Sequence, residues 1–320
     1  MLLVCPWIIY AQTKYQTAPA SSTESRVFDD VHVPLAAAAS VSVGVTLAVV
    51  AAGLLHALWN AAAHGGADRA IGFVLIGTTS TLLGIALVPW AALPAGGAWP
   101  YLGCSAAVHA TYNLLLLRSY QLGDFGQTYP LARGLSPLVV GVVAVTIVGQ
   151  PLPLWHALGL ISVCAGLGFV AFGGGGLRGA HRPALVAAGF TGLAIATYTV
   201  LDGVGVRHAH STLGYVAWLF VLQSPLLPIG VAVRRGVLAT LRACRPQLAM
   251  GIGSGLVSVL AYGIVIWAQT RATLASVAAT REVSILFGAI IGHFAFREPF
   301  GRWRVTGAVL TVAGIAALNL

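Results

Sequence analysis

Two arginines stand inside long apolar runs of the sequence, where a charged side chain is expensive. Arg133 lies in the run 125–148 and Arg281 in the run 272–296. An arginine at the centre of a membrane helix costs about 2.5–3.5 kcal/mol on insertion scales, so it must face a cavity or a partner. Because a guanidinium binds carboxylate or phosphate oxygens through two parallel hydrogen bonds, we expect both arginines to line a central cavity and to hold an anionic group of a ligand.

The alternative for these two arginines is structural. Arg281 would then pair with Glu282 or with a backbone carbonyl near Pro130. A direct pair between Arg281 and Glu282 has poor geometry, because adjacent residues of a helix do not share a face. Glu282 could instead reach Arg133 across a helix interface, or it could line the cavity and carry a coupling proton.

Other polar side chains in the apolar runs are further candidates for the cavity. His56 and Asn60 stand four residues apart and therefore share one helix face. They could contact a ligand or move a proton, or they could hydrogen-bond to a neighbouring helix. The remaining candidates have aromatic or amide side chains: Trp59, Tyr112, Asn113, Tyr129, Tyr198, Tyr262 and Gln269.

Two prolines interrupt the run that carries Arg133. Pro130 and Pro137 each remove a backbone donor, which frees carbonyl groups one turn earlier in the helix. Freed carbonyls are tolerated at membrane depth where neighbouring helices or a water-filled cavity satisfy them. We therefore predict a bend in this helix, which serves either as a gate beside the cavity or for packing alone.

The elements that must position these residues are membrane helices. The chain has 320 residues, of which 58% are hydrophobic and 8% charged, whereas a soluble domain carries about 25% charged residues. The mean hydropathy of +0.88 means that lipid must solvate most of the surface. This excludes a soluble enzyme, a disordered protein and a coiled coil.

Ten apolar runs approach the roughly 20 residues that a helix needs to cross a bilayer. They are 41–62, 70–90, 101–120, 125–148, 154–172, 183–202, 212–233, 247–268, 272–296 and 304–318. The expected fold class is therefore all-α integral membrane, with ten transmembrane helices.

The ten runs divide five and five around four consecutive glycines, Gly173–Gly176. A shift of 148 residues aligns the two halves and places Arg133 on Arg281, and it also matches a glutamine, a proline and a tryptophan. A duplicated unit with an odd number of spans must enter the membrane from opposite sides. The sequence therefore predicts two inverted five-helix repeats, which are typical of secondary transporters.

This reading divides the chain into four segments. They are a flexible N-terminal tail, or a start site assigned too early, over 1–40, a first repeat over 41–173, a Gly/Arg linker over 174–182 and a second repeat over 183–320.

The charge pattern excludes several other functions. The formal net charge is +9, but the basic residues are scattered between apolar runs and form no nucleic-acid-binding face. Lys14 is the only lysine, so there is no P-loop for ATP. The four cysteines form no CxxC pair, and the apolar runs hold too few acids for a two-carboxylate catalytic site. We expect no enzyme activity, no cofactor and no metal.

Three motifs carry a resemblance to a known family. They are His56-Ala-Leu-Trp-Asn60, Tyr129-Pro-Leu-Ala-Arg-Gly-Leu-Ser-Pro137 and Arg281-Glu-Val-Ser-Ile-Leu-Phe287, the last followed by Arg297-Glu298-Pro299 and the spaced glycines Gly307 and Gly314. With ten runs in two halves, the chain resembles the drug/metabolite transporter superfamily, and within it the EamA-type transporters, over about residues 41–320. One departure is Gly149-Gln150, where the family tends to have a Gly-Glu or Lys-Glu turn.

The resemblance implies transport of amino acids or related metabolites across the bacterial inner membrane by alternating access, without a cofactor. We therefore expect a secondary transporter of a small polar or anionic metabolite, with a coupling proton as a further partner, in a monomer or homodimer. The alternatives are a lipid-carrier flippase and a non-transporting scaffold or regulatory partner. The family is usually drawn with both termini in the cytoplasm, whereas the loop arginines favour both termini outside.

Overall fold

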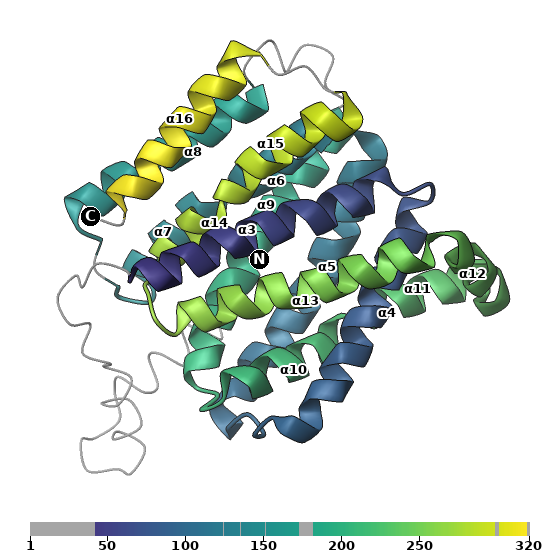
Figure 1. Ribbon diagram of the computed structural model, residues 1–320. Helices are drawn as coiled ribbons and strands as arrows, with labels where there is room; N and C mark the ends of the chain where they lie inside the picture. Colours follow the sequence, from purple (N-terminus) through teal and green to yellow (C-terminus); the bar gives the residue numbers. More distant parts are fainter. Residues whose placement is uncertain are drawn as a thin grey trace, which may run out of the picture. The chain divides into compact units, whose positions relative to one another are not determined.

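The computed structural model describes residues 42–123, 125–134, 136–150, 152–172, 182–297 and 301–318. The expected tail over 1–40 and the linker, apart from Arg182, lie outside these ranges, as do Glu298 and Pro299. The described residues form helices and no strand (Figure 1). The helices are α3 (Val43–Gly65), α4 (Arg69–Leu87), α5 (Trp99–Leu122), α6 (Phe125–Gly134), α7 (Ser136–Thr146), α8 (Leu154–Phe172), α9 (Arg182–Arg207), α10 (Thr212–Gln223), α11 (Leu226–Arg235), α12 (Val237–Cys244), α13 (Leu248–Gln269), α14 (Leu274–Arg281), α15 (Val283–Phe296) and α16 (Arg302–Ala317), with short 3-10 turns at Val88–Trp90, Gly96–Ala98 and Arg245–Gln247.

Short polar side chains mark the starts of several helices. Ser42, Asp68, Ser211 and Thr273 each accept a hydrogen bond from a backbone N–H in the first turn of the following helix. Such caps satisfy donors that a helix start leaves without an intrahelical partner. The capping residues therefore fix where α3, α4, α10 and α14 begin.

Each of the ten predicted runs contains helix, but ten spanning helices are not confirmed. Seven segments of the described residues are long and apolar enough to cross a membrane: Val43–Gly65, Arg69–Trp90, Thr128–Thr146, Arg182–Arg207, Thr212–Arg235, Val237–Gln269 and Leu274–Ala295. The apolar helix within α8 is shorter, at Leu154–Val170, and α16 has only 16 residues. Helix α5 has 24 residues, but polar side chains such as His109 and Asn113 interrupt its apolar character.

The two predicted spans that carry the candidate arginines each contain two of the described helices. The run 125–148 contains α6 and α7 on either side of Leu135, which lies outside the described residues, and Pro130 lies inside α6. Pro137 is the second described residue of α7. The run 272–296 was expected to be continuous, yet it breaks at Glu282, which ends α14 and precedes α15. No proline or glycine marks this break.

The two halves pack in matching pairs. Helix α5 packs against α9 in the way that α13 packs against α3, while α10 packs against α4. Helices α8 and α16 lie side by side at one edge of the bundle (Figure 1).

Four glycines allow α8 and α16 to approach closely, and we call them the glycine seam: Gly159, Gly166, Gly307 and Gly314. A Cβ atom on Gly166 would lie 2.6 Å from the carbonyl oxygen of Gly307, and one on Gly159 would lie 2.8 Å from that of Gly314. Both distances are too short for a side chain, so only glycine fits. Because the earlier glycine of α8 meets the later glycine of α16, the two helices run antiparallel.

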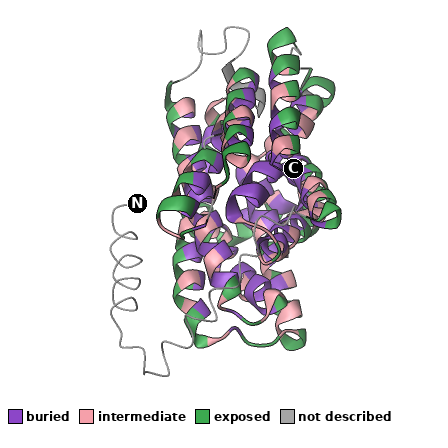
Figure 2. Cartoon of the chain, turned by 90° about the vertical axis from the view of Figure 1, so that its left-hand side faces the viewer, coloured by how far each residue is buried: buried purple, intermediate pink, exposed green. Residues whose placement is uncertain are grey.

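The distribution of burial is that of a protein in lipid. Large apolar side chains such as Leu82, Ile161 and Val309 are exposed, whereas ionisable groups such as Arg281 and Asp202 are fully buried. Figure 2 shows the buried residues in the interior of the helical bundle and the exposed residues on its outside. Exposed apolar and buried ionic residues suit a hydrocarbon surround and a polar interior. The chain is a multi-pass membrane protein.

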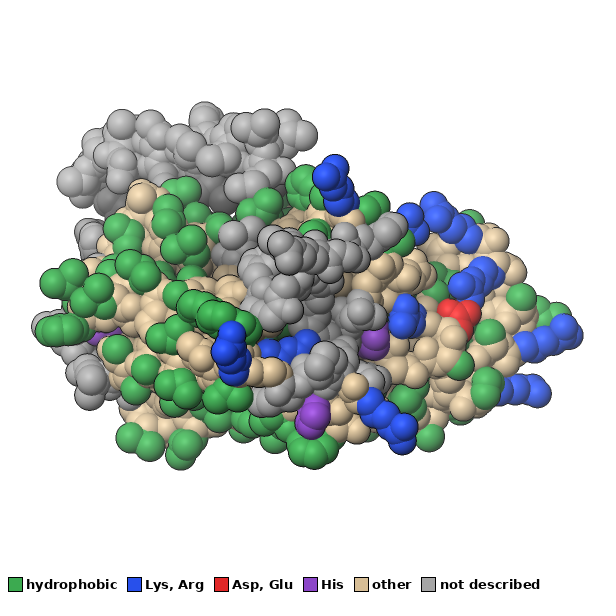
Figure 3. All heavy atoms as spheres, turned by 90° about the horizontal axis from the view of Figure 1, so that it is seen from above, with side chains coloured by type: hydrophobic (Ala, Val, Ile, Leu, Met, Phe, Trp, Pro, Cys, Tyr) green, Lys and Arg blue, Asp and Glu red, His purple; other side chains and the backbone are tan. Residues whose placement is uncertain are grey.

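An exposed ion pair joins the start of α4 to the end of α11. The guanidinium of Arg235 donates to the Asp68 carboxylate, whose other oxygen accepts from the N–H groups of Ala70 and Ile71. Burial alone would raise the pKa of Asp68, but these hydrogen bonds and the charge of Arg235 hold it below its ordinary value. Figure 3 views the molecule from above and shows most basic side chains toward one side, with an acidic side chain among them.

Candidate functional site

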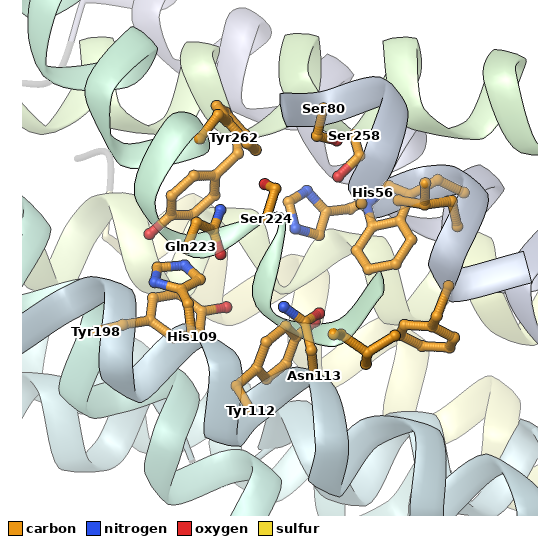
Figure 4. Close-up of a pocket in the computed structure, with 16 residues that line it drawn as sticks. His56, Ser80, His109, Tyr112, Asn113, Tyr198, Gln223, Ser224, Ser258 and Tyr262 are labelled. Carbon is orange, nitrogen blue, oxygen red and sulfur yellow. The ribbon is translucent and has the colours of Figure 1, made fainter. Parts of the chain in front are cut away.

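A polar and aromatic pocket lies between helices of both halves (Figure 4). The empty space within it is about 580 Å³, a volume that includes open solvent at its mouth. The ring side chains that line it are His56, Trp59, Phe73, His109, Tyr112, Tyr198, Phe220 and Tyr262. The hydroxyl and amide side chains are Ser80, Asn113, Gln223, Ser224 and Ser258. None of the described lining residues is an aspartate, glutamate, lysine or arginine.

Helical spacing explains how several of these side chains reach the pocket. His109, Tyr112 and Asn113 stand at positions i, i+3 and i+4 of α5, and His56 and Trp59 at positions i and i+3 of α3. Residues at these intervals share one face of a helix. Helices α3, α4 and α5 of the first half and α9, α10 and α13 of the second half therefore each present a polar or aromatic face to the same space.

The rings pack on one another at one side of the pocket. The imidazole of His109 stacks on Tyr198, with ring centroids 3.8 Å apart. Tyr262 contacts both rings edge-on, with centroids 5.4 Å from His109 and 5.7 Å from Tyr198. This packing fixes the orientation of hydroxyl and imidazole groups, as recognition of a small polar ligand requires.

Half of the predicted cavity residues line this pocket. They are His56, Trp59, Tyr112, Asn113, Tyr198 and Tyr262. The other six lie outside its lining: Asn60, Tyr129, Arg133, Gln269, Arg281 and Glu282.

Two of the residues outside the lining bond to a neighbouring helix, and a third lies against Arg133 of its own helix. Asn60 accepts a hydrogen bond of 2.8 Å from the Tyr120 hydroxyl, which is the structural alternative considered for it. The amide of Gln269 donates to the carbonyl of Thr199 at 3.2 Å. The Tyr129 ring lies below the Arg133 guanidinium, with 5.8 Å between the guanidinium carbon and the ring centroid.

Arg133, Arg281 and Glu282 form a buried cluster that we call the ionic centre. Arg133 donates two hydrogen bonds to Glu282, with Nε 2.9 Å from Oε2 and Nη2 3.1 Å from Oε1. Glu282 thus reaches Arg133 across the helix interface, as one of the sequence alternatives allowed. We expected both guanidiniums to face the cavity and bind a ligand. In the structure, Arg133 instead donates its two parallel hydrogen bonds to the carboxylate of Glu282.

Arg281 is held more loosely than Arg133. Its Nε lies 3.7 Å from Oε1 of Glu282, and its Nη2 lies 3.4 Å from the Thr199 hydroxyl. Neither arginine lines the pocket, but the charges of Arg133 and Arg281 act on His56, and the charge of Arg281 acts on His109. The pocket therefore lies in the field of both arginines without being lined by either.

A second buried acid, Asp202, lies just behind the pocket and was missed in the sequence. Tyr262 donates to Oδ2 at 2.5 Å, Tyr215 donates to Oδ1 at 2.9 Å, and Nε2 of His109 lies 4.0 Å from Oδ2. The apolar run ends at Asp202 in the sequence, but α9 continues to Arg207, and Asp202 is buried within this helix. Two features of the sequence could have indicated this site. One is a carboxylate within an apolar run, and the other is His109 on the same helix face as Tyr112 and Asn113.

The described residues contain no group of three or more histidine, cysteine, aspartate or glutamate side chains that could hold a metal ion. The rings, amides and hydroxyls of the pocket are suited to holding a small organic molecule.

Comparisons with known proteins give a family for the second half and a fold for most of the chain. Residues 182–320 match the sequence profile of the EamA-like transporter family. A solved structure described only as a crystal structure of a protein is similar over 87% of this chain and 98% of that chain, with a TM-score of 0.62 and 18% sequence identity. At this identity the likeness shows the fold alone. A search of the curated proteins found no match.

Proposed function

We propose that the chain is a secondary transporter that moves a small polar metabolite across the membrane by alternating access. Residues 182–320 match the EamA-like transporter family, which is a transporter family and not an enzyme family. The observation that carries the proposal is the pocket, because helices of both halves line it with rings, amides and hydroxyls.

The glycine seam supports two inverted repeats. The 148-residue shift exchanges the contact between Gly159 and Gly314 with the contact between Gly166 and Gly307. Ser162 donates at 2.9 Å to the carbonyl of Leu310, its own mate under the shift. Equivalent helices that meet antiparallel and exchange their contacts in this way are what a two-fold axis in the membrane plane produces. Rocking of one half against the other would then open the pocket to alternate sides.

The lining favours a small cargo with hydrogen-bonding groups. Hydroxyl and amide groups of Ser80, Asn113, Gln223, Ser224 and Ser258 surround the space, and rings cover its apolar sides. The field of Arg281 favours a cargo that carries a negative group, such as a carboxylate. The proposal is therefore a small polar or anionic metabolite that binds through neutral side chains in a positive field.

The test is uptake of a panel of metabolites into proteoliposomes that contain the purified protein. Asn113→Ala removes a hydrogen-bonding group from the pocket, and Thr111→Ala on the same helix is the matched control because Thr111 is exposed and bonds only to the carbonyl of Ala107 in the described structure. A lost hydrogen bond of about 1–1.5 kcal/mol lowers transport at sub-saturating cargo by about tenfold for Asn113→Ala. Thr111→Ala should transport as wild type does.

Two outcomes would contradict the proposal. Transbilayer movement of labelled lipid without metabolite uptake would make the protein a flippase. Folded protein that moves neither metabolites nor lipid would make it a scaffold or regulatory partner.

A further inference from the structure

Asp202 is a buried acid without a cation in hydrogen-bond contact within the described structure. Its two oxygens accept from the hydroxyls of Tyr262 and Tyr215, and the Ser105 hydroxyl is a third hydrogen-bond partner; all three are neutral donors. Glu282, in contrast, accepts two hydrogen bonds from Arg133 and lies beside Arg281. Neutralising Glu282 would remove the carboxylate that contacts two guanidiniums, whereas neutralising Asp202 removes a contacting carboxylate from neither guanidinium.

The charges of the ionic centre and Asp202 add up to zero only when Asp202 is ionised. Arg133 and Arg281 carry two positive charges, and Glu282 and Asp202 carry two negative charges. A proton on Asp202 leaves one positive charge without a buried counterion. An anionic group bound in the neighbouring pocket would compensate that charge.

From this juxtaposition we propose that Asp202, reached through His109, is the proton site of the transporter and that a proton and an anionic cargo bind together. This inference rests on the proposed transport function and adds to it the coupling ion, its site and the direction of coupling. Glu282, the coupling candidate of the sequence analysis, is instead the fixed counterion of the ionic centre.

His109 connects the pocket with Asp202. It lines the pocket, its Nδ1 lies 3.1 Å from the carbonyl oxygen of Ser105, and its Nε2 faces Asp202. A hydronium ion in the pocket gives a proton to Nε2 and leaves water, so that an imidazolium faces the carboxylate. Nε2 and Oδ2 are 4.0 Å apart, so the transfer passes through one bridging water or follows a closer approach of the ring. It breaks the new N–H bond, forms an O–H bond on Oδ2 and restores the neutral imidazole.

Several helices that pack against α9 contribute a group to the surroundings of Asp202. Neutral groups come from α5 with Ser105 and His109, from α10 with Tyr215 and from α13 with Tyr262. Arg281 of α14 acts on Asp202 through its charge, and Arg133 of α6 is already paired with Glu282. A change in the proton on Asp202 is therefore felt by Arg281, whose charge also acts on the pocket.

Cargo and proton share two side chains. Tyr262 and His109 both line the pocket and both face Asp202. A ligand that moves either ring changes the proton affinity of Asp202, and by linkage the proton changes cargo affinity by the same factor. Because the charges favour joint binding, the proton and the cargo should cross in the same direction.

The first experiment measures uptake of the anionic cargo found in the panel, with and without an inward proton gradient of one pH unit. One proton for each cargo molecule supports about tenfold accumulation in the wild type. Asp202→Asn should reduce the ratio of uptake with the gradient to uptake without it to one. Asp68→Asn changes an exposed acid that is paired with Arg235 and does not line the pocket, so it should keep the wild-type ratio. A ratio that stays high in Asp202→Asn would overturn the proposal.

The second experiment does not depend on transport. Infrared pH titration of the purified protein in detergent should show the band of a protonated buried carboxyl that is lost in Asp202→Asn and retained in Asp68→Asn. Cargo addition to weakly buffered protein should take up a proton from the medium, and release of a proton would contradict joint binding. If the wild type transports nothing but the carboxyl band is present, the proposed function fails and the proton site stands.

Discussion

The glycine seam and the ionic centre both join the two halves of the chain, but only in the seam do the two halves contribute equivalent residues. In the seam, the 148-residue shift exchanges one close glycine contact with the other. In the ionic centre, the shift relates Arg133 to Arg281, but it relates Glu282 to Gly134. The second half therefore supplies the carboxylate for both arginines, and the first half supplies none.

This difference separates what holds the halves together from what the centre can do. Close packing of two equivalent helices needs only small residues in equivalent places, so duplication preserves it. An ion pair needs unlike residues, so one copy must diverge. Arg133 donates two hydrogen bonds to Glu282, and Arg281 lies beside the same carboxylate. The charges of both arginines act on His56 of the pocket. The pocket therefore lies in the field of a centre whose one carboxylate comes from the second half.

The largest expected effect comes from removing the shared acid. Glu282→Ala leaves two buried guanidiniums without their carboxylate, and loss of one partner of a buried pair costs about 3–5 kcal/mol. Arg133→Met should cost less, because Glu282 retains Arg281 at 3.7 Å. Thermal unfolding of the purified protein in detergent measures both.

The double variant Arg133→Met/Glu282→Ala distinguishes pairing from simple loss of packing. If Arg133 and Glu282 act as a pair, the double variant should be less destabilised than the sum of the two single variants. Equal cost for both single variants and full additivity would mean that the centre is not organised around Glu282.

A smaller effect is expected in the glycine seam, and it should be equal on both sides. A Cβ atom on Gly166 or on Gly307 would lie 2.6 or 2.5 Å from the carbonyl oxygen of the other glycine. Gly166→Ala and Gly307→Ala should each lower the free energy of unfolding by about 1–3 kcal/mol through overpacking. Gly168→Ala is the control on α8, because nothing lies within 4 Å of its added Cβ.

Clearly different losses of unfolding free energy for Gly166→Ala and Gly307→Ala would contradict equivalent packing of the two glycines. The control should be neutral or slightly stabilising, since alanine is the better helix former.

The sequence predicted helix positions well because long apolar runs are a strong signal in a membrane protein. It did not predict how many of them span, because α5 carries the polar pocket face and α16 is short. It also missed the break at Glu282, where the backbone turns without proline or glycine. Backbone turns of that kind are fixed by tertiary contacts, which one sequence does not display.

The candidate site was half predictable. Tyr198 and Tyr262 were recognisable as aromatic residues in apolar runs, and both line the pocket. Asp202 was read as the end of a run because a charge inside lipid is unfavourable, but its burial is made tolerable by two tyrosine hydroxyls from other helices. The hydroxyls that bond Asp202 come from distant parts of the chain. The sequence around Asp202 therefore does not show that α9 continues beyond it.

The smallest effect is expected at the pair of Asp68 and Arg235, which joins the halves as the ionic centre does but is exposed. Asp68→Asn keeps a side-chain oxygen to cap α4 and removes only the charge, so it should cost about 0.2–1 kcal/mol at pH 7. The pKa of Asp68 is lowered on folding, so the ionised pair stabilises the protein above the ordinary value of 3.8 and loses this contribution as the pH falls through the lowered value. Thermal unfolding at pH 7 and near pH 3 should therefore show a difference between Asp68→Asn and wild type that shrinks at the lower pH. A difference as large as that of Glu282→Ala, or one that grows on acidification, would mean that burial does not set the importance of an ion pair between the halves.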